Sequence, residues 1–522
     1  MDLHIDLVGR RGLADQIYRA LRAAILDGRL RAGERLPPTR ELARRLQVSR
    51  NTVGVAYDRL MGEGFLVTRI GAGTYVCDHF GASASPRRRI TRQELMPHER
   101  WNVPCPHQWN AVGRPPRGGV MYDFRVGLPD VTLFPFETWR RLVARELRLS
   151  AVRTAAYGDP AGHAGLRAAI ARHVAVSRAV KADADAVTVT AGAQQAVDLI
   201  VRVLLGPGDC AAVEEPGYPP VRLLMQSLGA RVCPVPVDSQ GIVVEAIPRD
   251  ARLIYVSPSH QFPLGMPMSL ARRMELLTWA GEHDAAIIED DYDSEFRFGG
   301  RPIETLYGLD TRGRVLYVGT FSKTMLPAIR LGFLIAPRSL LTALRVAKYA
   351  SDWFAPLATQ AALARFIDEG LLARHTRKMR AEYERRHERV LQVLADQGGW
   401  LQPIESGAGL HLTALLADGQ QLSAAAVLER TDGSGVVASP LAAFYANRPA
   451  QSGLVLGYGA IQLTKIENGL RLLRHVLSAP AHATAGLATS AEPYPSGSPR
   501  AMARSSGARR PELLLDYNDR VN

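Results

Sequence analysis

Residues 79–120 cannot build a hydrophobic core, and this stretch divides the 522-residue chain into two parts. It contains small residues at 81–86, three arginines at 87–89 and a run of Arg, Pro and Gly at 114–119. Such a composition is typical of a linker, and the chain is too long for one ordinary domain. We therefore expect a small folded unit at 10–78, a flexible linker at 79–120, a larger unit at 121–478 and a disordered tail, rich in Ala, Ser, Pro and Gly, at 479–522.

Positive charge is distributed unevenly along the chain. The net charge is +13, and residues 1–78 contribute 13 Arg against 9 acidic residues, whereas residues 79–120 contribute 7 Arg against 2. A genome rich in GC explains an abundance of arginine but not this asymmetry. An unequal basic load favours contact with a polyanion.

Composition excludes several other classes of protein. The apolar fraction is 47% and the charged fraction 22%, both near globular averages. No run approaches the roughly 18 apolar residues of a membrane span, and the first residues lack the pattern of a signal peptide. The 4 cysteines form no C-x-x-C pair and no zinc spacing, which indicates reduced thiols. We expect a cytoplasmic protein that does not contact a membrane.

The N-terminal unit has the pattern of three helices followed by two short strands. Apolar residues recur at helical spacing over 13–26. A second helix is predicted to start with Thr39 as its N-cap, and a third with Ser49 as its N-cap. Strands are predicted at 65–68 and 74–76, joined by a glycine-rich turn.

This order of elements predicts a winged helix-turn-helix that binds double-stranded DNA. The start of the third helix would enter the major groove, where Arg matches guanine and Asn matches adenine, while the second helix and the turn would contact phosphates. The alternative is a small helical module that binds another protein. The residues expected at base edges are Ser49, Arg50, Asn51 and Thr52, and those expected at phosphates are Thr39, Arg40, Gly71 and Gly73.

The N-terminal unit resembles the GntR family of bacterial repressors. The stretches that carry the resemblance are Leu36–Ala43, Val48–Val53 and Gly71–Val76, in that order along the whole unit. The resemblance implies a DNA-binding regulator rather than a protein-interaction module.

The larger unit alternates strand-like apolar runs with helix-like segments. Strands are predicted at 187–190, 253–257, 285–289 and 315–319. This alternation is typical of an α/β sheet covered by helices.

Lysine is rare in this chain, and its positions are informative. A Schiff base needs a primary amine, which Arg cannot supply. Lys323 follows a predicted buried strand and is flanked by hydroxyl side chains, which a surface charge explains poorly. The other four lysines are predicted to be solvated surface charges: Lys181, Lys348, Lys378 and Lys465.

Two further patterns complete a candidate cofactor site. The turn at 190–195 leads from a strand into a helix, whose free N–H groups attract anions, and Thr320, Ser322 and Arg330 supply hydroxyls and a cation. The acidic run Glu289–Asp293 follows a buried strand, where sites form in α/β sheets. A carboxylate there can keep a pyridine nitrogen protonated. A divalent-metal site is the alternative for this run, but no histidine is obviously paired with it, and we expect no metal.

The larger unit resembles the fold-type I aminotransferases, which depend on pyridoxal 5'-phosphate, and the fused chain resembles the MocR/GabR subfamily of GntR regulators. The stretches that carry this resemblance are Tyr157–Gly162, Glu215–Pro219, Ser257–Gly265, Glu289–Phe296 and Gly319–Lys323. The expected fold is therefore two domains, a winged helix-turn-helix and an α/β aminotransferase-like domain.

The resemblance also implies a role for each site residue. Lys323 forms the internal aldimine, Asp290 pairs with the pyridine nitrogen, Tyr292 hydrogen-bonds the ring oxygen and Tyr218 stacks on the ring. The phosphate is held by Ala193, Gln194, Thr320, Ser322 and Arg330.

Two positions depart from the family pattern. Phe262 stands where aminotransferases carry Asn before a proline, so ring-oxygen contacts are expected from Tyr292 and from His260 or Gln261, unless His260 is a core histidine. Ala460 stands where relatives that bind amino-acid carboxylates often carry Arg, which leaves the carboxylate anchor unidentified.

The leading hypothesis is a homodimeric transcriptional regulator in which an amino compound reacts at Lys323 and alters DNA binding through the linker. One alternative is an active aminotransferase with a DNA-binding head. Another is a sensor of pyridoxal phosphate itself.

Overall fold

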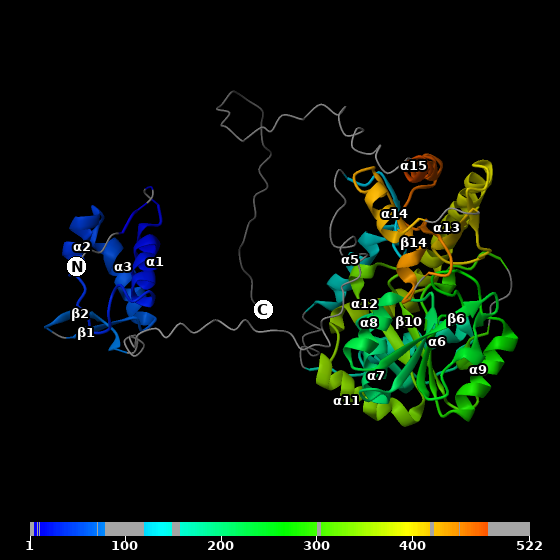
Figure 1. Ribbon diagram of the computed structural model, residues 1–522. Coiled ribbons are helices and arrows are strands. Elements are labelled where there is room, and N and C mark those ends of the chain that lie inside the picture. The colour runs from blue at the N-terminus through cyan, green and yellow to red at the C-terminus, as the bar shows by residue number, and fades with distance from the viewer. Residues whose placement is uncertain are drawn as a thin grey trace, which may run out of the picture. The chain divides into compact units, whose positions relative to one another are not determined.

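The computed structural model describes residues 5–7, 9, 11–69, 71–78, 119–148, 157–299, 304–417, 422–447 and 449–478. The chain divides into two compact units, residues 1–97 and 98–522 (Figure 1). The predicted linker, except residues 119 and 120, and the predicted tail lie outside the described residues. The proposed domain boundaries stay predictions.

The N-terminal unit is three helices and a two-stranded antiparallel sheet. Its helices pack through a common apolar core that includes Ile17, Leu21, Val53 and Leu60, all fully buried. The elements are α1 (Leu13–Leu26), α2 (Thr39–Leu46), α3 (Arg50–Gly62), β1 (Leu66–Arg69) and β2 (Gly73–Val76).

The N-termini of the two helices of the helix-turn-helix motif, α2 and α3, are capped differently. The Ser49 hydroxyl accepts a hydrogen bond from the backbone N–H of Thr52, at 3.1 Å, so the predicted N-cap of α3 is confirmed. The predicted N-cap at Thr39 is wrong, because α2 begins at Thr39 after Pro38 and no side chain caps it. The Thr39 hydroxyl instead accepts a hydrogen bond from Nε of Arg50, at 3.4 Å, which joins the two helices.

An eight-stranded mixed sheet forms the centre of the larger unit, in the order β4-β11-β10-β9-β8-β5-β6-β7. Strands β10, β9, β8, β5 and β6 run parallel, whereas β11 is antiparallel to both its neighbours and β7 is antiparallel to β6. The strands are β4 (Val187–Thr190), β5 (Cys210–Glu215), β6 (Arg231–Asp238), β7 (Gly241–Ile242), β8 (Ala251–Val256), β9 (Ala286–Asp291), β10 (Val315–Thr320) and β11 (Gly332–Ile335).

Helices cover both faces of this sheet (Figure 1). Leu253 and Tyr255 of β8 pack on one face and Ile254 and Val256 on the other, which explains why this strand is apolar at successive positions. The covering helices are α5 (Phe136–Glu146), α6 (Ala164–Arg178), α7 (Ala193–Leu204), α8 (Pro219–Ser227), α9 (Leu270–Glu282), α10 (Leu306–Leu309), α11 (Leu341–Ser351) and α12 (Leu357–Asp368).

A second sheet has five strands in the order β12-β13-β15-β14-β3. The first strand of the unit, β3, pairs in parallel with β14 near the other end of the unit. The strands are β3 (Tyr122–Phe124), β12 (Leu401–Pro403), β13 (His411–Leu416), β14 (Val436–Pro440) and β15 (Gly453–Gly457), and the helices that pack on them are α13 (Leu371–Asp396), α14 (Ala424–Thr431) and α15 (Ile466–Ser478).

The predicted architecture of two domains is confirmed, and the four predicted sheet strands match the observed ones to within two residues at each end. The prediction that Lys348 is a surface charge is wrong. Its side chain is fully buried on the inner face of α11, beside Leu344, and forms an ion pair with Asp352 one turn further along. No described helix combines the length and apolar character needed to cross a membrane.

Candidate cofactor site

A cavity of about 400 Å³ lies between the carboxyl ends of the central parallel strands and the five-stranded sheet. Its volume is within the usual range for a small-molecule site. Every residue that the sequence predicted for the cofactor lines this one cavity: Ala193, Gln194, Tyr218, Asp290, Tyr292, Thr320, Ser322, Lys323 and Arg330.

Lys323 lies in the turn after β10. The Thr320 hydroxyl donates to the Ser322 hydroxyl, at 2.9 Å, and accepts from the Ser322 N–H, at 3.2 Å, which shapes the turn. Nζ of Lys323 donates a hydrogen bond to the carbonyl oxygen of Gly127, at 2.7 Å. Burial lowers the pKa of Lys323, although Asp293 and Asp290 act in the opposite direction. A lowered pKa increases the neutral, nucleophilic fraction of the amine.

Asp290, the second-last residue of β9, has one carboxylate oxygen in a hydrogen bond and one without a partner among the described residues. Its Oδ2 accepts a hydrogen bond from the Tyr255 hydroxyl on neighbouring β8, whereas its buried Oδ1 has no partner among the described residues. Burial raises the pKa of Asp290 to about 7. A buried carboxyl oxygen without a partner, at the wall of a cavity, is suited to a protonated ring nitrogen, which would supply the missing partner and favour the ionised form.

The start of α7 forms the anion-binding end of the cavity. Gly192 has a φ of 82° directly before the helix, and a Cβ there would lie 3.1 Å from Nη2 of Arg330. Arg330 itself donates to the carbonyl oxygen of Ala191, at 2.7 Å. Free N–H groups in the first turn, together with a fixed guanidinium, are a suitable environment for a phosphate.

Tyr292 is held by His260 rather than left free. The Tyr292 hydroxyl lies 2.9 Å from Nδ1 and 3.0 Å from the carbonyl oxygen of His260. Nδ1 of His260 is also 3.0 Å from the Asp293 carboxylate, and Nε2 is 3.2 Å from the Ser406 hydroxyl. His260 is therefore a core histidine with both ring nitrogens engaged, and its contact with Tyr292 positions the phenol.

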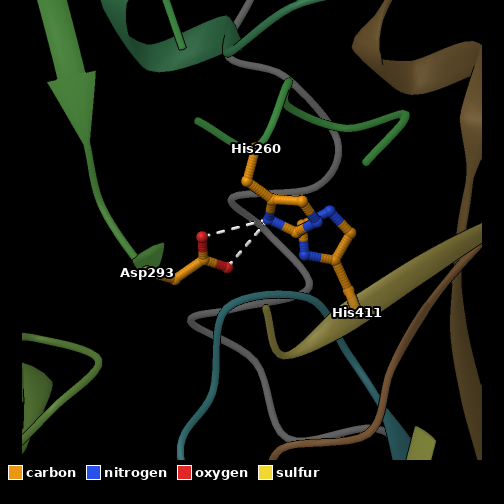
Figure 2. A group of neighbouring side chains, drawn as sticks. All are labelled: His260, Asp293 and His411. Atoms are coloured by element: carbon orange, nitrogen blue, oxygen red, sulfur yellow. Dashed lines mark hydrogen bonds and ion pairs between the residues drawn. The ribbon is translucent and has the colours of Figure 1, made fainter. Parts of the chain in front are cut away.

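The expectation that no histidine is paired with the acidic run is wrong. Figure 2 shows His260 bonded to Asp293, with His411 beside them. Ligand atoms of these three residues lie within 4.8 Å of one another, but Nε2 of His411 also has a protein partner, the carbonyl oxygen of Pro263, at 3.2 Å. Three of the four ring nitrogens in this group are thus engaged by the protein itself.

The four acids of the run point to different partners. Glu289 accepts from the backbone N–H groups of Leu306 and Tyr307, at 3.0 and 2.8 Å, and Asp291 accepts from Nε of buried Arg178, at 2.6 Å. Because successive strand residues face opposite sides of a sheet, the run does not converge on one point.

At the position where aminotransferases carry Asn, Phe262 places an aromatic ring in the wall of the cavity. Its ring makes edge contacts with Tyr218, Tyr292 and Phe444, with centroids 5.4, 5.8 and 5.3 Å apart. The amide of Gln261 donates to the carbonyl oxygens of Pro216 and Phe262. Gln261 therefore stabilises the backbone at Pro216 and Phe262 through these two hydrogen bonds.

Reasoning from sequence missed three residues that bear on the site. Tyr255 lies within a predicted strand, and nothing local distinguishes its hydroxyl from that of any buried tyrosine. Gly127 and Arg125 both line the cavity, although they lie almost 200 positions before Lys323. No spacing rule connects residues so far apart.

The predicted DNA contacts lie on the surface of the N-terminal unit. Arg40, Ser49, Arg50, Asn51 and Gly71 are exposed, while Thr39, Thr52 and Gly73 are half-buried. Asn51 and its neighbours form the first turn of α3, and Gly71 and Gly73 lie at the turn between β1 and β2, with φ of 75° and 118°. The geometry is that of a helix-turn-helix with a glycine-tipped wing.

A surface helix-turn-helix fused to an aminotransferase-type cavity defines a class of two-domain regulators. Residues 13–76 match the family of bacterial regulatory proteins of the gntR family, and residues 124–454 match aminotransferase class I and II. The chain is 39% identical over 467 residues to the "Probable rhizopine catabolism regulatory protein MocR" of Rhizobium meliloti, covering 88% of this chain and 92% of that protein. The chain belongs to the MocR-type family of transcriptional regulators.

Other relatives and solved structures agree with this assignment. The pyridoxine biosynthesis regulator PdxR of Corynebacterium glutamicum is 31% identical over 85% of this chain and 91% of its own length. The kynurenine aminotransferase of Pyrococcus horikoshii matches with a TM-score of 0.66 at 26% identity, over 73% of this chain and 96% of that one. The α-aminoadipate aminotransferase LysN of Thermus thermophilus matches with a TM-score of 0.62 at 28% identity, over 68% and 91%. The fold-type I aminotransferase domain is thus confirmed, and its cavity fits pyridoxal 5'-phosphate.

Proposed function

We propose that this regulator holds pyridoxal phosphate in the cavity and changes its DNA binding when an amino compound reacts at Lys323. Pyridoxal phosphate, when bound, supplies an aldehyde that a primary amine can attack and a ring that withdraws electrons. The residues of the chain that would hold it are Lys323 at the aldehyde, Asp290 at the ring nitrogen, Tyr292 at the ring oxygen, Tyr218 on the ring face, and Ala193, Gln194, Thr320, Ser322 and Arg330 at the phosphate.

One contact carries the proposal. Nζ of Lys323 donates to the carbonyl oxygen of Gly127, and Gly127 lies seven residues after the predicted linker ends at 120. The amine at the reaction centre therefore touches the segment of chain that continues toward the DNA-binding domain. Any change in the bonding of Nζ alters its hydrogen bond to that segment, and this is the coupling that a sensor needs.

Asp290 and Tyr255 together form the part of the site that would bind the ring nitrogen of the cofactor. The Tyr255 hydroxyl donates to Oδ2 of Asp290, which stabilises the ionised carboxylate. Oδ1, which has no partner among the described residues, is then the acceptor available to a protonated nitrogen. The lowered pKa of Lys323 favours the neutral amine, so the chain supplies both an acceptor and a nucleophile.

DNA recognition is assigned to the N-terminal unit. Arg50 and Asn51 would reach base edges and Arg40 and the wing would reach phosphates, as an exposed α3 start allows. We propose that the protein acts as a homodimer in the cytoplasm, so that two heads read two half-sites of a promoter.

The test compares Lys323→Ala with Lys378→Ala, a change at an exposed lysine of α13. DNA binding to the protein's own promoter fragment is measured with the pyridoxal-phosphate-loaded protein, with and without a panel of amino acids and amines. We expect an effector to change the affinity of the wild type and of Lys378→Ala but not of Lys323→Ala. An unchanged response in Lys323→Ala would contradict the proposal.

The same assay separates the two other functions. A difference in affinity between cofactor-free and cofactor-loaded protein, with no response to any amine, identifies a sensor of pyridoxal phosphate. Turnover of an amino donor with a 2-oxo acid at about 10 per second, an ordinary enzymatic rate, identifies an active aminotransferase.

A further inference from the structure

Arg125 is a cation in the cavity that the proposed cofactor does not use. Three cations line the described part of this cavity: Arg125, Lys323 and Arg330. Lys323 is assigned to the aldehyde and Arg330 to the phosphate. Of the two carboxylates in the wall, Asp290 is assigned to the ring nitrogen of the proposed cofactor and Asp293 is hydrogen-bonded to His260. Arg125 forms an ion pair with Asp123, which does not line the cavity, and it is the cation that the cofactor assignment leaves for a second ligand.

The guanidinium of Arg125 is oriented but still has donors available. Its Nε lies 2.9 and 3.1 Å from the two carboxylate oxygens of Asp123, and its Nη2 lies 2.5 Å from one of them. Nη1 donates to no described residue. Asp123 thus occupies one edge of the planar group, and the Nη1–Nη2 edge remains open for a carboxylate bound in bidentate fashion.

Arg125 also lies close to the reactive amine along the chain. It precedes by two residues Gly127, whose carbonyl oxygen accepts from Nζ of Lys323. Two residues of extended chain span about 7 Å. A ligand that presents an amine toward Lys323 can therefore reach Arg125 with a nearby carboxylate.

Packing places the backbone of Arg125 beside the end of β15, close in the chain to Ala460, where the arginine is missing. A Cβ at Gly457 would lie 2.1 Å from the carbonyl oxygen of Arg125, and a Cβ at Gly459 would lie 2.2 Å from that of Leu128. The segment that carries Arg125 therefore lies directly against residues 457–459. A cation carried by this segment, which follows β3, can therefore take the place of one at the end of β15.

We propose that Arg125 binds the carboxylate of the effector, and that the effector is an amino acid with a single carboxylate. This inference rests on the proposed function. A diamine would find no free carboxylate among the described residues that line the cavity, and a dicarboxylic amino acid would find no second free cation there. The walls beside Arg125 include Val437 and Ala438, which are paired in register with β3 and favour an uncharged remainder.

The test uses matched ligands that differ only in the carboxylate. L-alanine, β-alanine and 4-aminobutyrate are each titrated beside their methyl esters into the cofactor-loaded full chain, and binding is followed by the change in cofactor absorbance. The protein variants are wild type, Arg125→Gln, Arg125→Lys and Arg249→Gln, the last at an exposed turn of the same unit.

We expect the wild type and Arg249→Gln to bind one of the acids at least about tenfold more tightly than its ester, the ratio typical of a charged hydrogen bond. Arg125→Gln should lose this ratio and keep its affinity for the ester within about twofold. Arg125→Lys, which keeps the charge without the planar fork, should give an intermediate ratio. It also provides a readout if the glutamine variant folds poorly.

A wild type with no preference for any of the three acids would overturn the inference, as would an Arg125→Gln variant that keeps the preference. Neither result touches the proposed function, because the esters still report reaction at Lys323. Failure of the proposed function is recognised separately, by an effector response that survives Lys323→Ala.

Discussion

Lys323 and Gly127 are 196 residues apart in the sequence, yet Nζ of the lysine donates a 2.7 Å hydrogen bond to the carbonyl oxygen of the glycine. A Cβ at position 127 would lie 3.0 Å from Nζ. Glycine at this position therefore provides the close approach that brings the reactive amine against the segment leading back to the linker.

Gly127→Ala is expected to slow the loading of pyridoxal phosphate at Lys323. The added methyl group displaces Nζ, and the φ of 80° also strains an alanine by about 1–2 kcal/mol. Gly208→Ala is the matched control, since Gly208 has a φ of 87° but no atom within 4 Å of the added Cβ. Borohydride trapping followed by mass spectrometry measures the modified fraction. Equal loading rates in the two variants would show that the Gly127 contact is not needed.

The unfolding free energy of the cofactor-free protein should depend on pH through Asp290. Its pKa is raised from 3.8 to about 7 in the folded protein, chiefly by burial, so its stabilising contribution is complete below pH 3.8 and is lost as the pH rises toward 7. Asp290→Asn removes this titration. We expect the difference between wild type and variant to change by about 1.4 kcal/mol per pH unit between roughly pH 4 and 7.

Urea unfolding followed by tryptophan fluorescence measures this difference, because all 6 tryptophans lie after residue 100 and none lies in residues 1–78. Asp396→Asn, at an exposed carboxylate of α13, serves as the control. Its difference from wild type should stay constant with pH. A constant difference for Asp290→Asn as well would show that Asp290 is ionised in the folded protein throughout this range.

Tyr255→Phe should weaken the binding of pyridoxal phosphate by about tenfold or more, the usual effect of losing a hydrogen bond to a charged group. Without the Tyr255 hydroxyl, the ionised form of Asp290 loses its donor and the pKa of Asp290 rises further. Titration of the cofactor-free protein, followed by absorbance, gives the affinity. Tyr349→Phe, which alters an exposed ring on α11, should bind as the wild type does. Similar affinities for the two variants would exclude a role for the Tyr255 hydroxyl.

Two substitutions in the DNA-binding unit should have different consequences. Asn51→Ala removes a side chain at the exposed start of α3, and we expect a loss of about 1–3 kcal/mol confined to the cognate promoter sequence. Arg40→Ala should instead weaken binding to all sequences and reduce the salt dependence by about one counterion. Fluorescence anisotropy with promoter and scrambled duplexes at several salt concentrations distinguishes them. A uniform loss in Asn51→Ala would place that residue at the phosphate backbone.

Local patterns were sufficient for much of the architecture. Helical spacing over Leu13–Leu26 predicts α1 to the residue, and the apolar run at Val187–Thr190 predicts β4 to the residue. Capping was less certain, because Ser49 caps α3 whereas Thr39 lies inside α2. A hydroxyl before a helical pattern does not reveal whether its oxygen faces the helix or a neighbouring side chain.

The scarcity of lysine directed attention to Lys323 from the sequence alone, because only a primary amine can perform the expected chemistry. The assignment of Lys348 to the surface was wrong, since an amphipathic pattern among charges does not show which face of α11 meets the core. The ion pair with Asp352 lets that buried ammonium persist.

The sequence by itself determined the division into two units, the helix-turn-helix, the strand-end lysine and the acidic run, because each depends on periodicity or composition within a short window. Tertiary structure alone decided that Gly127 meets Lys323, that His260 engages Asp293, and that Arg125 lines the same cavity. These relationships join segments far apart in the chain, and their distances are set by the packing of the two sheets, which no local pattern encodes.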